Sequence, residues 1–263
     1  MSSGIATIAV IPIRKEPSEQ SEMTSQVLFG EHFTLLEKRR KWTLVRLAFD
    51  DYEGWIDSKM ITPIDDDSFN HLNEKEAVCT NSIITNAYTT DSEYPVRLMP
   101  GSSLPGFDEK KKTFSVAGVN YKLDKDTVFI KHGKDLRNDI RNFSLSFMNA
   151  PYLWGGRTPF GMDCSGLTQL VYKLCGYRIP RDANKQVNTG RTLSFLNEAK
   201  PGDLAFFDND DGNIVHVGLI AGPDKIIHAS GRVRIDKIDH QGIYNGDIKQ
   251  YTHKLRVIQN IID

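Results

Sequence analysis

The sequence lacks an excess of charge of either sign, and it lacks any long run of apolar residues. Its 33 basic and 34 acidic side chains leave a formal net charge of −1, so neither nucleic acid nor an anionic membrane is an expected partner. No run of about 18 apolar residues occurs, so no membrane-spanning helix is expected. Met1–Pro12 has no basic cluster and no helical apolar stretch, and no signal peptide is expected. These absences favour a cytoplasmic protein; an exported protein whose leader was removed is the alternative.

Cysteine is also scarce. The three cysteines, Cys79, Cys164 and Cys175, are widely spaced and odd in number, which argues against a disulfide framework and favours a reducing compartment. No Cys-x-x-Cys pair is present, so a zinc ribbon is unexpected and no metal site is predicted.

Short alternating strands with turn residues between them predict a small β-barrel domain over residues 1–66. These strands are expected at Ile5–Ile13, Val27–Phe29, Phe33–Glu37, Trp42–Phe49 and Gly54–Ile56. The polar, acidic segment Asp65–Asn73 is expected to be a linker. A looser repeat of the pattern predicts a second small β-domain over residues 76–131, with strands at Val78–Ala87, Pro95–Met99, Thr113–Val116 and Thr127–Ile130.

Residues 132–263 are expected to form a third domain, because the pattern changes at Asp135. Apolar residues at helical spacing follow it, and Pro151 is expected to end this helix. A second amphipathic helix is expected after Cys164, with Gly176 at its end. Strands then follow at Asp203–Phe207, Ile214–Ala221, Lys225–Ala229, Val233–Ile235 and Leu255–Ile258. Helices first and strands later indicate an α+β domain.

Cys164 stands where a glycine-rich loop meets the start of that second helix, a place that suits a catalytic thiol. A free cysteine is only a few per cent thiolate at neutral pH. A helix N-terminus stabilises an anion by about 0.3–1 kcal/mol, and a nearby imidazolium lowers a thiol pKa further. Ser165 and Gly166 keep the first turn small, so their backbone N–H groups are candidates to bind an oxyanion. The alternative is a buried structural cysteine, which is the expectation for Cys79 and Cys175.

Two histidines stand in neighbouring apolar strands further along the chain. If Gly222–Asp224 forms the turn between these strands, the register places His228 opposite Gly218. His216 and His228 then lie diagonally on one face of the sheet, about 7–8 Å apart between backbones. His216 becomes a candidate base and His228 the residue that orients it, with isolated core histidines as the alternative.

The other histidines lie in polar or mixed sequence and are expected at the surface; they are His32, His71, His132, His240 and His253.

Six motifs follow one another in the third domain: Tyr152–Gly156, Asp163–Gly166, Ile179–Asp182, Lys200–Leu204, His216–Gly218 and His228–Ser230. In these motifs, residues 135–263 closely resemble the NlpC/P60 cysteine peptidases, which implies a papain-like catalytic domain. The two preceding β-domains resemble bacterial SH3 modules. This three-part layout is similar to that of endopeptidases of the dipeptidyl-peptidase VI type, which cut γ-D-glutamyl–L-diamino acid bonds during murein-peptide recycling.

The resemblance implies roles for single residues of the catalytic centre. Cys164 is expected to be the nucleophile, His216 the base and His228 the third polar residue. Tyr152 is expected to assist the oxyanion hole through its hydroxyl.

The resemblance also implies that Asp163, Ser165 and Asp182 contact substrate. This chain departs from the family pattern at Ala183, where a small hydroxyl residue is common after the Pro-Arg-Asp segment. One hydrogen bond to substrate is therefore lost, or it is made by the backbone instead.

In the recycling subgroup, the first SH3-like module closes one end of the cleft and binds the free amine of L-alanine with an acidic residue and a tyrosine. Ser21–Met23 and Asp51–Trp55 resemble those segments, which implies that Glu22 and Tyr52 bind the amine. A carboxylate suits an ammonium, most of all in an enclosed site. Ordinary solvated loop residues are the alternative.

The expected function is hydrolysis of the γ-D-glutamyl–L-diamino acid bond, with meso-diaminopimelate or lysine, in murein peptides that carry a free N-terminal L-alanine. The product would be L-Ala-D-Glu. No cofactor is expected, because a thiol and imidazoles supply the chemistry. One alternative is an exported lytic endopeptidase that acts on polymeric peptidoglycan. The other is a wall-binding SH3-type protein with an inert catalytic domain, against which the intact Cys164, His216 and His228 argue.

Overall fold

The structure of the protein is a computed structural model that describes residues 2–74, 78–123 and 135–262. The chain divides into two compact units, residues 1–131 and 132–263. Each unit is described by itself. The expected strand Thr127–Ile130 and His132 lie outside the described residues.

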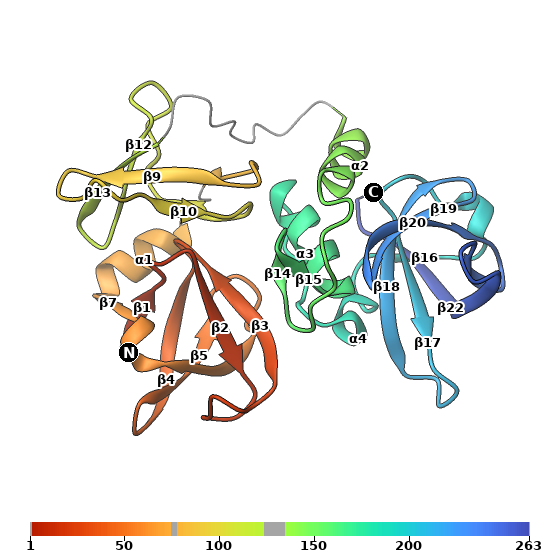
Figure 1. Cartoon of the computed structure of the whole chain (residues 1–263), viewed down its shortest axis with the longest axis horizontal. Coiled ribbons are helices and arrows are strands. Elements are labelled where there is room, and N and C mark those ends of the chain that lie inside the picture. Colours follow the sequence, from red (N-terminus) through yellow and green to blue (C-terminus); the bar gives the residue numbers. More distant parts are fainter. Residues whose placement is uncertain (1, 75–77, 124–134, 263) are drawn as a thin grey trace. The chain divides into compact units, whose positions relative to one another are not determined.

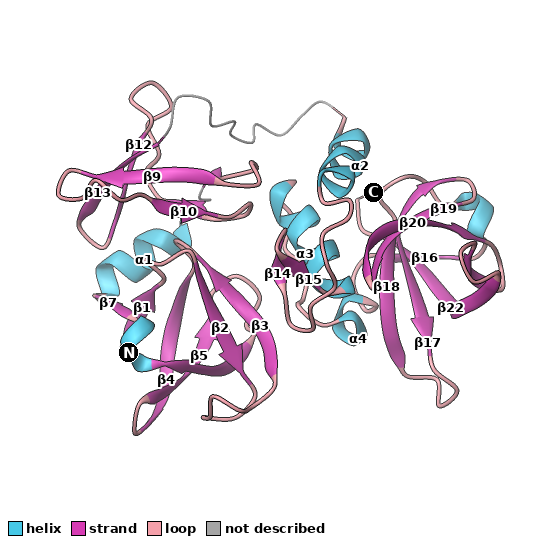
Figure 2. Ribbon diagram, in the orientation of Figure 1, coloured by secondary structure: helices cyan, strands magenta, loops and turns pink. Residues whose placement is uncertain are grey.

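The first unit begins with a curved antiparallel sheet of seven strands in the order β3-β2-β6-β5-β4-β1-β7 (Figures 1 and 2). The strands are β1 (Ser3–Ile5), β2 (Val10–Arg14), β3 (Met23–Leu28), β4 (His32–Arg39), β5 (Trp42–Leu47), β6 (Glu53–Asp57) and β7 (Thr62–Ile64), with a 3-10 turn η1 (Ser58–Met60) before β7. Their inward-facing side chains, which include Ile11, Ile13, Val27, Phe33 and Val45, form one apolar core.

Two expectations for this region are wrong. The run Ile5–Ile13 is not one strand, because the chain leaves the sheet after β1 and re-enters at β2. The segment expected to be a linker is helix α1 (Asp66–Glu74), whose first turn is stabilised by Asp65 accepting a hydrogen bond from the backbone N–H of Ser68 at 2.8 Å. Acidic residues that suggest a solvated linker also suit the positive end of a helix.

A second group of strands completes the first unit. It consists of a two-stranded sheet, β8 (Val78–Cys79) with β11 (Ser103–Leu104), and a four-stranded sheet in the order β10-β9-β13-β12, with β9 (Thr85–Thr89), β10 (Val96–Leu98), β12 (Thr113–Val116) and β13 (Val119–Leu123). The expected strand Val78–Ala87 is therefore two strands. Phe29, in the turn that follows β3, packs edge-on against Phe114 and Tyr121, with ring centroids 5.9 and 5.4 Å away. The two groups of strands thus share an aromatic core within one unit, and their separation into two domains remains a prediction.

The second unit begins with three helices. Helix α2 (Leu136–Ser146) starts at Asp135, whose side chain caps it by accepting from the N–H of Asn138. It ends before Pro151, so the proline is not what stops it. A small ribbon, β14 (Arg157–Thr158) with β15 (Gly161–Met162), precedes helix α3 (Cys164–Leu174), and Gly176 follows α3 with a φ of 80°, as predicted. A short helix, α4 (Ala183–Gln186), comes next.

The rest of the second unit is an antiparallel sheet in the order β16-β22-β17-β18-β19-β20-β21, in which β21 also pairs with β22. The strands are β16 (Arg191–Leu193), β17 (Leu204–Asp208), β18 (Ile214–Gly222), β19 (Lys225–Ser230), β20 (Arg232–Ile238), β21 (Gly242–Asn245) and β22 (Gln250–Asn260), with a 3-10 turn η2 (Leu196–Glu198) before β17. The additional pairing closes six strands, β17 to β22, into a barrel filled by an apolar core that includes Phe207, Ile220, Ile226, Ile243 and Ile258. Helix α3 packs against β18 and β19.

In the second unit the helices come first and pack against an antiparallel sheet, which confirms the α+β class. Figure 2 shows the helices in cyan and the strands in magenta. Among the described residues, none of the helices has the length and apolar character needed to cross a membrane.

Candidate active site

The thiol of Cys164 lies at the buried N-terminus of α3. The backbone N–H groups of Val217 and Ser165 favour its thiolate form and so oppose a rise of its pKa. Val217 directly follows His216 on β18, against which α3 packs. The fold therefore brings the thiol to the strand that carries the candidate base, 52 residues further along the sequence.

A buried ion pair holds the start of α3. Asp163 caps the helix by accepting from the N–H of Gly166 at 2.7 Å, and it also accepts from the N–H of Gly155 at 2.8 Å. The guanidinium of Arg181 donates to both carboxylate oxygens of Asp163, at 3.0 and 2.7 Å, and to the hydroxyl of Ser165 at 2.8 Å. The N–H of Gly166 is thus used inside the protein, so the expectation that it binds an oxyanion is wrong.

Two glycines allow the loop before α3 to approach the helix. A Cβ atom at Gly166 would lie 2.2 Å from the carbonyl oxygen of Gly156. A Cβ atom at Gly156 would lie 2.3 Å from the carbonyl oxygen of Gly161. Any side chain at either position would push the loop away from the cysteine.

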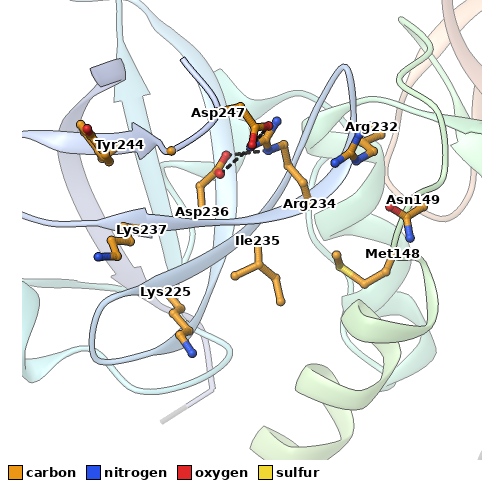
Figure 3. Close-up of a pocket in the computed structure, with 11 residues that line it drawn as sticks. Met148, Asn149, Lys225, Arg232, Arg234, Ile235, Asp236, Lys237, Tyr244 and Asp247 are labelled. Atoms are coloured by element: carbon orange, nitrogen blue, oxygen red, sulfur yellow. Dashed lines mark hydrogen bonds and ion pairs between the residues drawn. The ribbon is translucent and has the colours of Figure 1, made fainter. Parts of the chain in front are cut away.

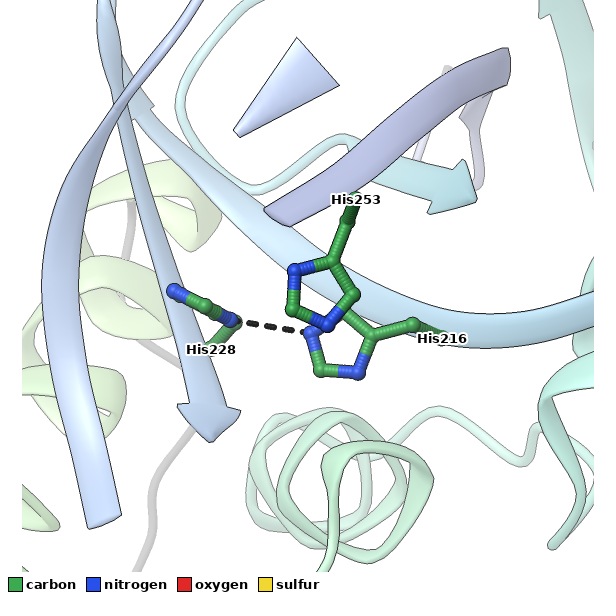
Figure 4. Close-up of side chains that lie close together, drawn as sticks. All are labelled: His216, His228 and His253. Atoms are coloured by element: carbon green, nitrogen blue, oxygen red, sulfur yellow. Dashed lines mark hydrogen bonds between the residues drawn. The ribbon is translucent and has the colours of Figure 1, made fainter. Parts of the chain in front are cut away.

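The predicted register of the two histidine strands is confirmed. His228 faces Gly218, and a bulge near the turn lets Gly222 pair with Lys225, which makes the turn shorter than expected. The ring nitrogens His216 Nε2 and His228 Nδ1 lie 2.9 Å apart (Figure 4). Both rings are buried.

The sequence analysis missed Asp236, which completes this chain of groups. Nε2 of His228 lies 3.0 Å from a carboxylate oxygen of the buried Asp236 on β20. A carboxylate accepts hydrogen bonds, so His228 carries its proton on Nε2 and its Nδ1 is an acceptor. His216 must then donate through its own Nε2, which leaves its Nδ1 with a free lone pair for proton transfer.

Arg234 supports Asp236 from the opposite side. Its guanidinium donates to Asp236 at 2.8 Å and to Asp247 at 2.9 Å. Figure 3 shows these three side chains converging at the wall of a pocket that the basic residues Lys225, Arg232 and Lys237 also line. The carboxylate behind His228 is therefore ion-paired as well as hydrogen-bonded, and these partners hold the pKa of Asp236 below its ordinary value in spite of its burial.

His253 was expected at the surface; it is half-buried, and the sequence analysis missed its contact with the site. Its ring, from β22, stacks on the ring of His216 with centroids 4.1 Å apart and planes inclined by 26° (Figure 4). The two strands are not neighbours, since β17 lies between them. Closure of the sheet into a barrel brings His253 across to His216, and sequence spacing does not reveal that closure.

The sequence did contain a signal for Asp236. Ser230-Gly231 is a turn signal, and the pairing of Ser230 with Arg232 produces a tight hairpin in which Asp236 faces Ile226. Asp236 is then diagonal to His228 on the same face. Continuing the strand register through this second hairpin would therefore have placed Asp236 beside His228 from the sequence alone.

Burial sets the charge state of the reacting groups. Burial, followed by the charge of Asp163, raises the pKa of the Cys164 thiol to about 12. Burial, followed by the neighbouring imidazoles of His253 and His228, lowers the pKa of His216 well below 6.5. The expected effect of the helix N-terminus on the thiol is outweighed, first by burial and then by the negative charge of the capping carboxylate of Asp163. The resting site therefore holds a neutral thiol and a neutral imidazole at pH 7.

The other predicted site residues of the second unit lie around the thiol. Tyr152 is 36% exposed, and burial, with the charges of Cys164 and Asp163, raises its pKa to about 12, so its hydroxyl remains a donor. Asp182 is half-buried, which raises the pKa of its carboxyl group, and it precedes the buried Ala183 at the start of α4. The contacts of Asp163 and Ser165 are structural ones within the protein, and contact of these residues with substrate remains a prediction.

Glu22 and Tyr52 belong to the first unit. Arg14 on β2 is in register with Met23 of β3 on one side and with Trp55 of β6 on the other. Both flanking strands run antiparallel to β2. Glu22 directly precedes β3 and Tyr52 directly precedes β6, so the two residues lie at the same end of these strands. Glu22 is exposed and lies 3.5 Å from the ammonium of Lys15. This placement of Glu22 and Tyr52 at one end of the sheet is compatible with a shared binding role, which remains a prediction.

Comparisons with known proteins agree with this architecture. Residues 149–256 match the NlpC/P60 family, and residues 13–61 match the bacterial dipeptidyl-peptidase SH3 domain. The gamma-D-glutamyl-L-lysine dipeptidyl-peptidase of Bacillus subtilis is 30% identical over 217 residues, which cover 78% of this chain and 71% of that protein. Dipeptidyl-peptidase 6 of Lysinibacillus sphaericus is 26% identical over 272 residues, which cover 89% of this chain and 91% of that protein. A crystal structure of a Bacillus cereus protein of the matched family aligns over 100% of both chains with a TM-score of 0.84 and 21% identity, which shows a common fold.

Proposed function

This chain belongs to the NlpC/P60 family of peptidases, and from that premise we propose that it is a cysteine endopeptidase specific for the γ-D-glutamyl–L-diamino acid bond of murein peptides. Its substrates would carry a free N-terminal L-alanine and a diamino acid, meso-diaminopimelate or lysine, and its product would be L-Ala-D-Glu. The relative in Bacillus subtilis, whose name specifies a γ-D-glutamyl-L-lysine bond, matches over 78% of the chain.

The observation that carries the proposal is the buried series of His216, His228 and Asp236, which begins on the strand against which the helix of Cys164 packs. A histidine base needs a partner that fixes its tautomer and stabilises its charge as it takes a proton. His228 alone, as a neutral imidazole, stabilises an imidazolium weakly, and the carboxylate of Asp236 behind it supplies the missing negative charge.

The reaction would proceed in two steps. Cys164 attacks the carbonyl carbon of the γ-glutamyl amide while its proton passes to Nδ1 of His216, and the hydroxyl of Tyr152 donates to the developing oxyanion. His216 then protonates the leaving amine of the diamino acid, and a thioester to the D-glutamyl γ-carboxyl remains. Water, deprotonated by His216, hydrolyses the thioester and releases L-Ala-D-Glu.

Hydrolysis of a defined peptide tests this proposal. Purified protein would be incubated with L-Ala-γ-D-Glu-meso-diaminopimelate and with the lysine analogue, and the products would be identified by mass spectrometry. L-Ala-D-Glu should appear with wild-type protein and not with Cys164→Ala. Absence of this product from both peptides would overturn the proposal. Cleavage of polymeric peptidoglycan in preference to the peptides would overturn it in favour of a lytic endopeptidase.

We propose further that Glu22 and Tyr52 bind the amine of the N-terminal alanine, and that the enzyme acts in the cytoplasm on free murein peptides. The match of residues 13–61 to the SH3 domain of bacterial dipeptidyl-peptidases supports a role for this module in the same reaction. The mechanism requires no cofactor, because Cys164 and His216 supply nucleophile and base.

A further inference from the structure

Three imidazoles meet at one end of the barrel interior in the second unit. His216, His228 and His253 each offer one ring nitrogen, and these nitrogens all lie within 4.8 Å of one another. The rings come from β18, β19 and β22, and in Figure 4 they lie close together, with the ring of His253 over that of His216. The proposed hydrolysis uses the first two rings and has no use for a third nitrogen donor.

We propose that these three histidines form an inhibitory binding site for a divalent transition metal ion, with Zn²⁺ as the best fit. Three neutral imidazoles and one open position are a common zinc ligand set, and Zn–N bonds of about 2.0–2.1 Å place tetrahedral ligands about 3.3 Å apart. The His216 and His228 nitrogens, 2.9 Å apart, need to separate only slightly, while the ring of His253 turns inward.

His216 and His228 are buried and His253 is half-buried, and a metal ion binds the neutral imidazole, which offers a lone pair. The carboxylate of Asp236 contacts the ring of His228 and places a negative charge behind the cluster, and the guanidinium of Arg234 offsets part of that charge.

The hydrogen-bond partners of the outer ring nitrogens resemble those found around histidine ligands in known metal sites. A metal-bound histidine usually donates its other N–H to a carboxylate or a similar acceptor, which fixes the ring and raises its basicity. His228 donates through Nε2 to Asp236, and Nδ1 of His253 lies 2.8 Å from the hydroxyl of Thr252. His228 thus presents Nδ1, and His253 presents Nε2, to the centre of the cluster.

Binding of the ion would stop catalysis. To ligate through Nε2, His216 must carry its proton on Nδ1, and that is the nitrogen from which the proposed mechanism starts. An ion in the cluster therefore removes the base without touching the thiol, and a chelator should restore activity fully.

Direct binding tests the site without any need for activity. In the Cys164→Ala background, where the thiol cannot ligate, Zn²⁺ binding would be measured by isothermal titration calorimetry and Co²⁺ binding by visible absorption. We expect one ion per chain and a tetrahedral Co²⁺ spectrum. The additional change His253→Phe, which preserves a stacking ring, and in a second variant His253→Gln, should each weaken Zn²⁺ binding at least about tenfold, or about 1.4 kcal/mol. The matched control His240→Phe removes an exposed histidine of the same unit and should leave binding unchanged.

The inhibitory part is tested with wild-type protein on the peptide substrate, where Zn²⁺ should abolish hydrolysis and EDTA should restore it. Zn²⁺ binding that is equally strong with and without His253, in folded variants, would overturn the proposal. So would undiminished hydrolysis at saturating Zn²⁺. If the peptide is not a substrate, the binding measurements still decide the question, so failure of the proposed function and failure of the metal site are distinguishable.

Discussion

At the scale of single residues, Asp236 determines how the buried imidazoles share their protons. Because its oxygen lies 3.0 Å from Nε2 of His228, the direction of every hydrogen bond in the series follows from one carboxylate. In the proposed mechanism, the same charge stabilises the imidazolium that forms when His216 takes the proton of Cys164. The side-chain contacts of Asp236 are with His228 and Arg234, so it is proposed as a positioning residue.

Replacing Asp236 with asparagine should lower kcat by about 10- to 100-fold, which corresponds to about 1.4–2.7 kcal/mol of transition-state stabilisation. An amide keeps the shape and can still accept from His228, but it no longer offsets a positive charge. Steady-state kinetics on the tripeptide would measure this, and KM should change little. Asp247→Asn is the control, because that exposed carboxylate contacts Arg234 and not the histidines. Equal losses in the two variants would contradict the assigned role.

The pH profile is a second test at this scale. His216 works as a base only when neutral, and its pKa lies well below 6.5 because of burial and then of the neighbouring imidazoles. Lowering the pH through 6.5 therefore leaves the base neutral, and the acid limb of kcat/KM should have its midpoint below 6.5. This midpoint reports the coupled imidazoles of the free enzyme rather than one ring. A midpoint at or above 6.5 would show that His216 is not desolvated as the structure requires.

At the scale of elements, the first turn of α3 positions the proposed nucleophile through a capping carboxylate that is itself ion-paired. The exposed Asp135 caps the N-terminus of α2 in the same way, but among the described residues it has no buried ion-pair partner. These two caps make a matched pair, since both are aspartates that accept from the N–H three residues ahead.

Asp163→Ala should lower the free energy of unfolding by about 3–5 kcal/mol, because the buried guanidinium of Arg181 loses its counter-charge. Asp135→Ala should cost only about 0.5–2 kcal/mol, the usual value of an N-cap. Urea unfolding monitored by circular dichroism would compare them. If the two costs are similar, the Asp163–Arg181 pair contributes little beyond capping.

Most of the helices and strands that carry the candidate site could be predicted from the sequence. The periodicity after Cys164 and the alternation around His216 located α3, β18 and β19, and even the pairing of His228 with Gly218 followed from a turn signal. Local patterns failed where the decisive contact is distant. Nothing near His253 indicates that β22 closes the barrel, and nothing near Asp163 indicates that Arg181 will neutralise it.

At the scale of the whole molecule, the proposed substrate specificity depends on residues of one unit and catalysis on residues of the other. Glu22 and Tyr52 precede strands that flank β2, whereas the thiol and the imidazoles belong to residues 132–263. An ammonium bound by Glu22 would affect binding of the substrate much more than the chemical step.

Glu22→Gln should therefore raise KM for the free-amine tripeptide by about 10- to 100-fold, or about 1.4–2.7 kcal/mol, with kcat little changed. N-acetylation of the alanine should slow cleavage by wild-type protein and remove the difference between wild type and variant. Glu19→Gln is the control, since Glu19 lies in the same loop and pairs with Lys41 at 2.8 Å. A KM that responds equally to both substitutions, or not at all to Glu22→Gln, would refute the amine-binding role.

The arrangement of the acid–base groups on successive hairpins has a consequence for how the enzyme matures. His216, His228 and Asp236 come from β18, β19 and β20, which are joined by tight turns, so these three groups can find one another early in folding with little loss of chain entropy. Cys164 must reach them from 52 residues away, by docking of α3. If α3 docks only after these hairpins have formed, the folding chain holds the proposed base before the proposed nucleophile lies beside it, and the chain is inactive until the helix docks.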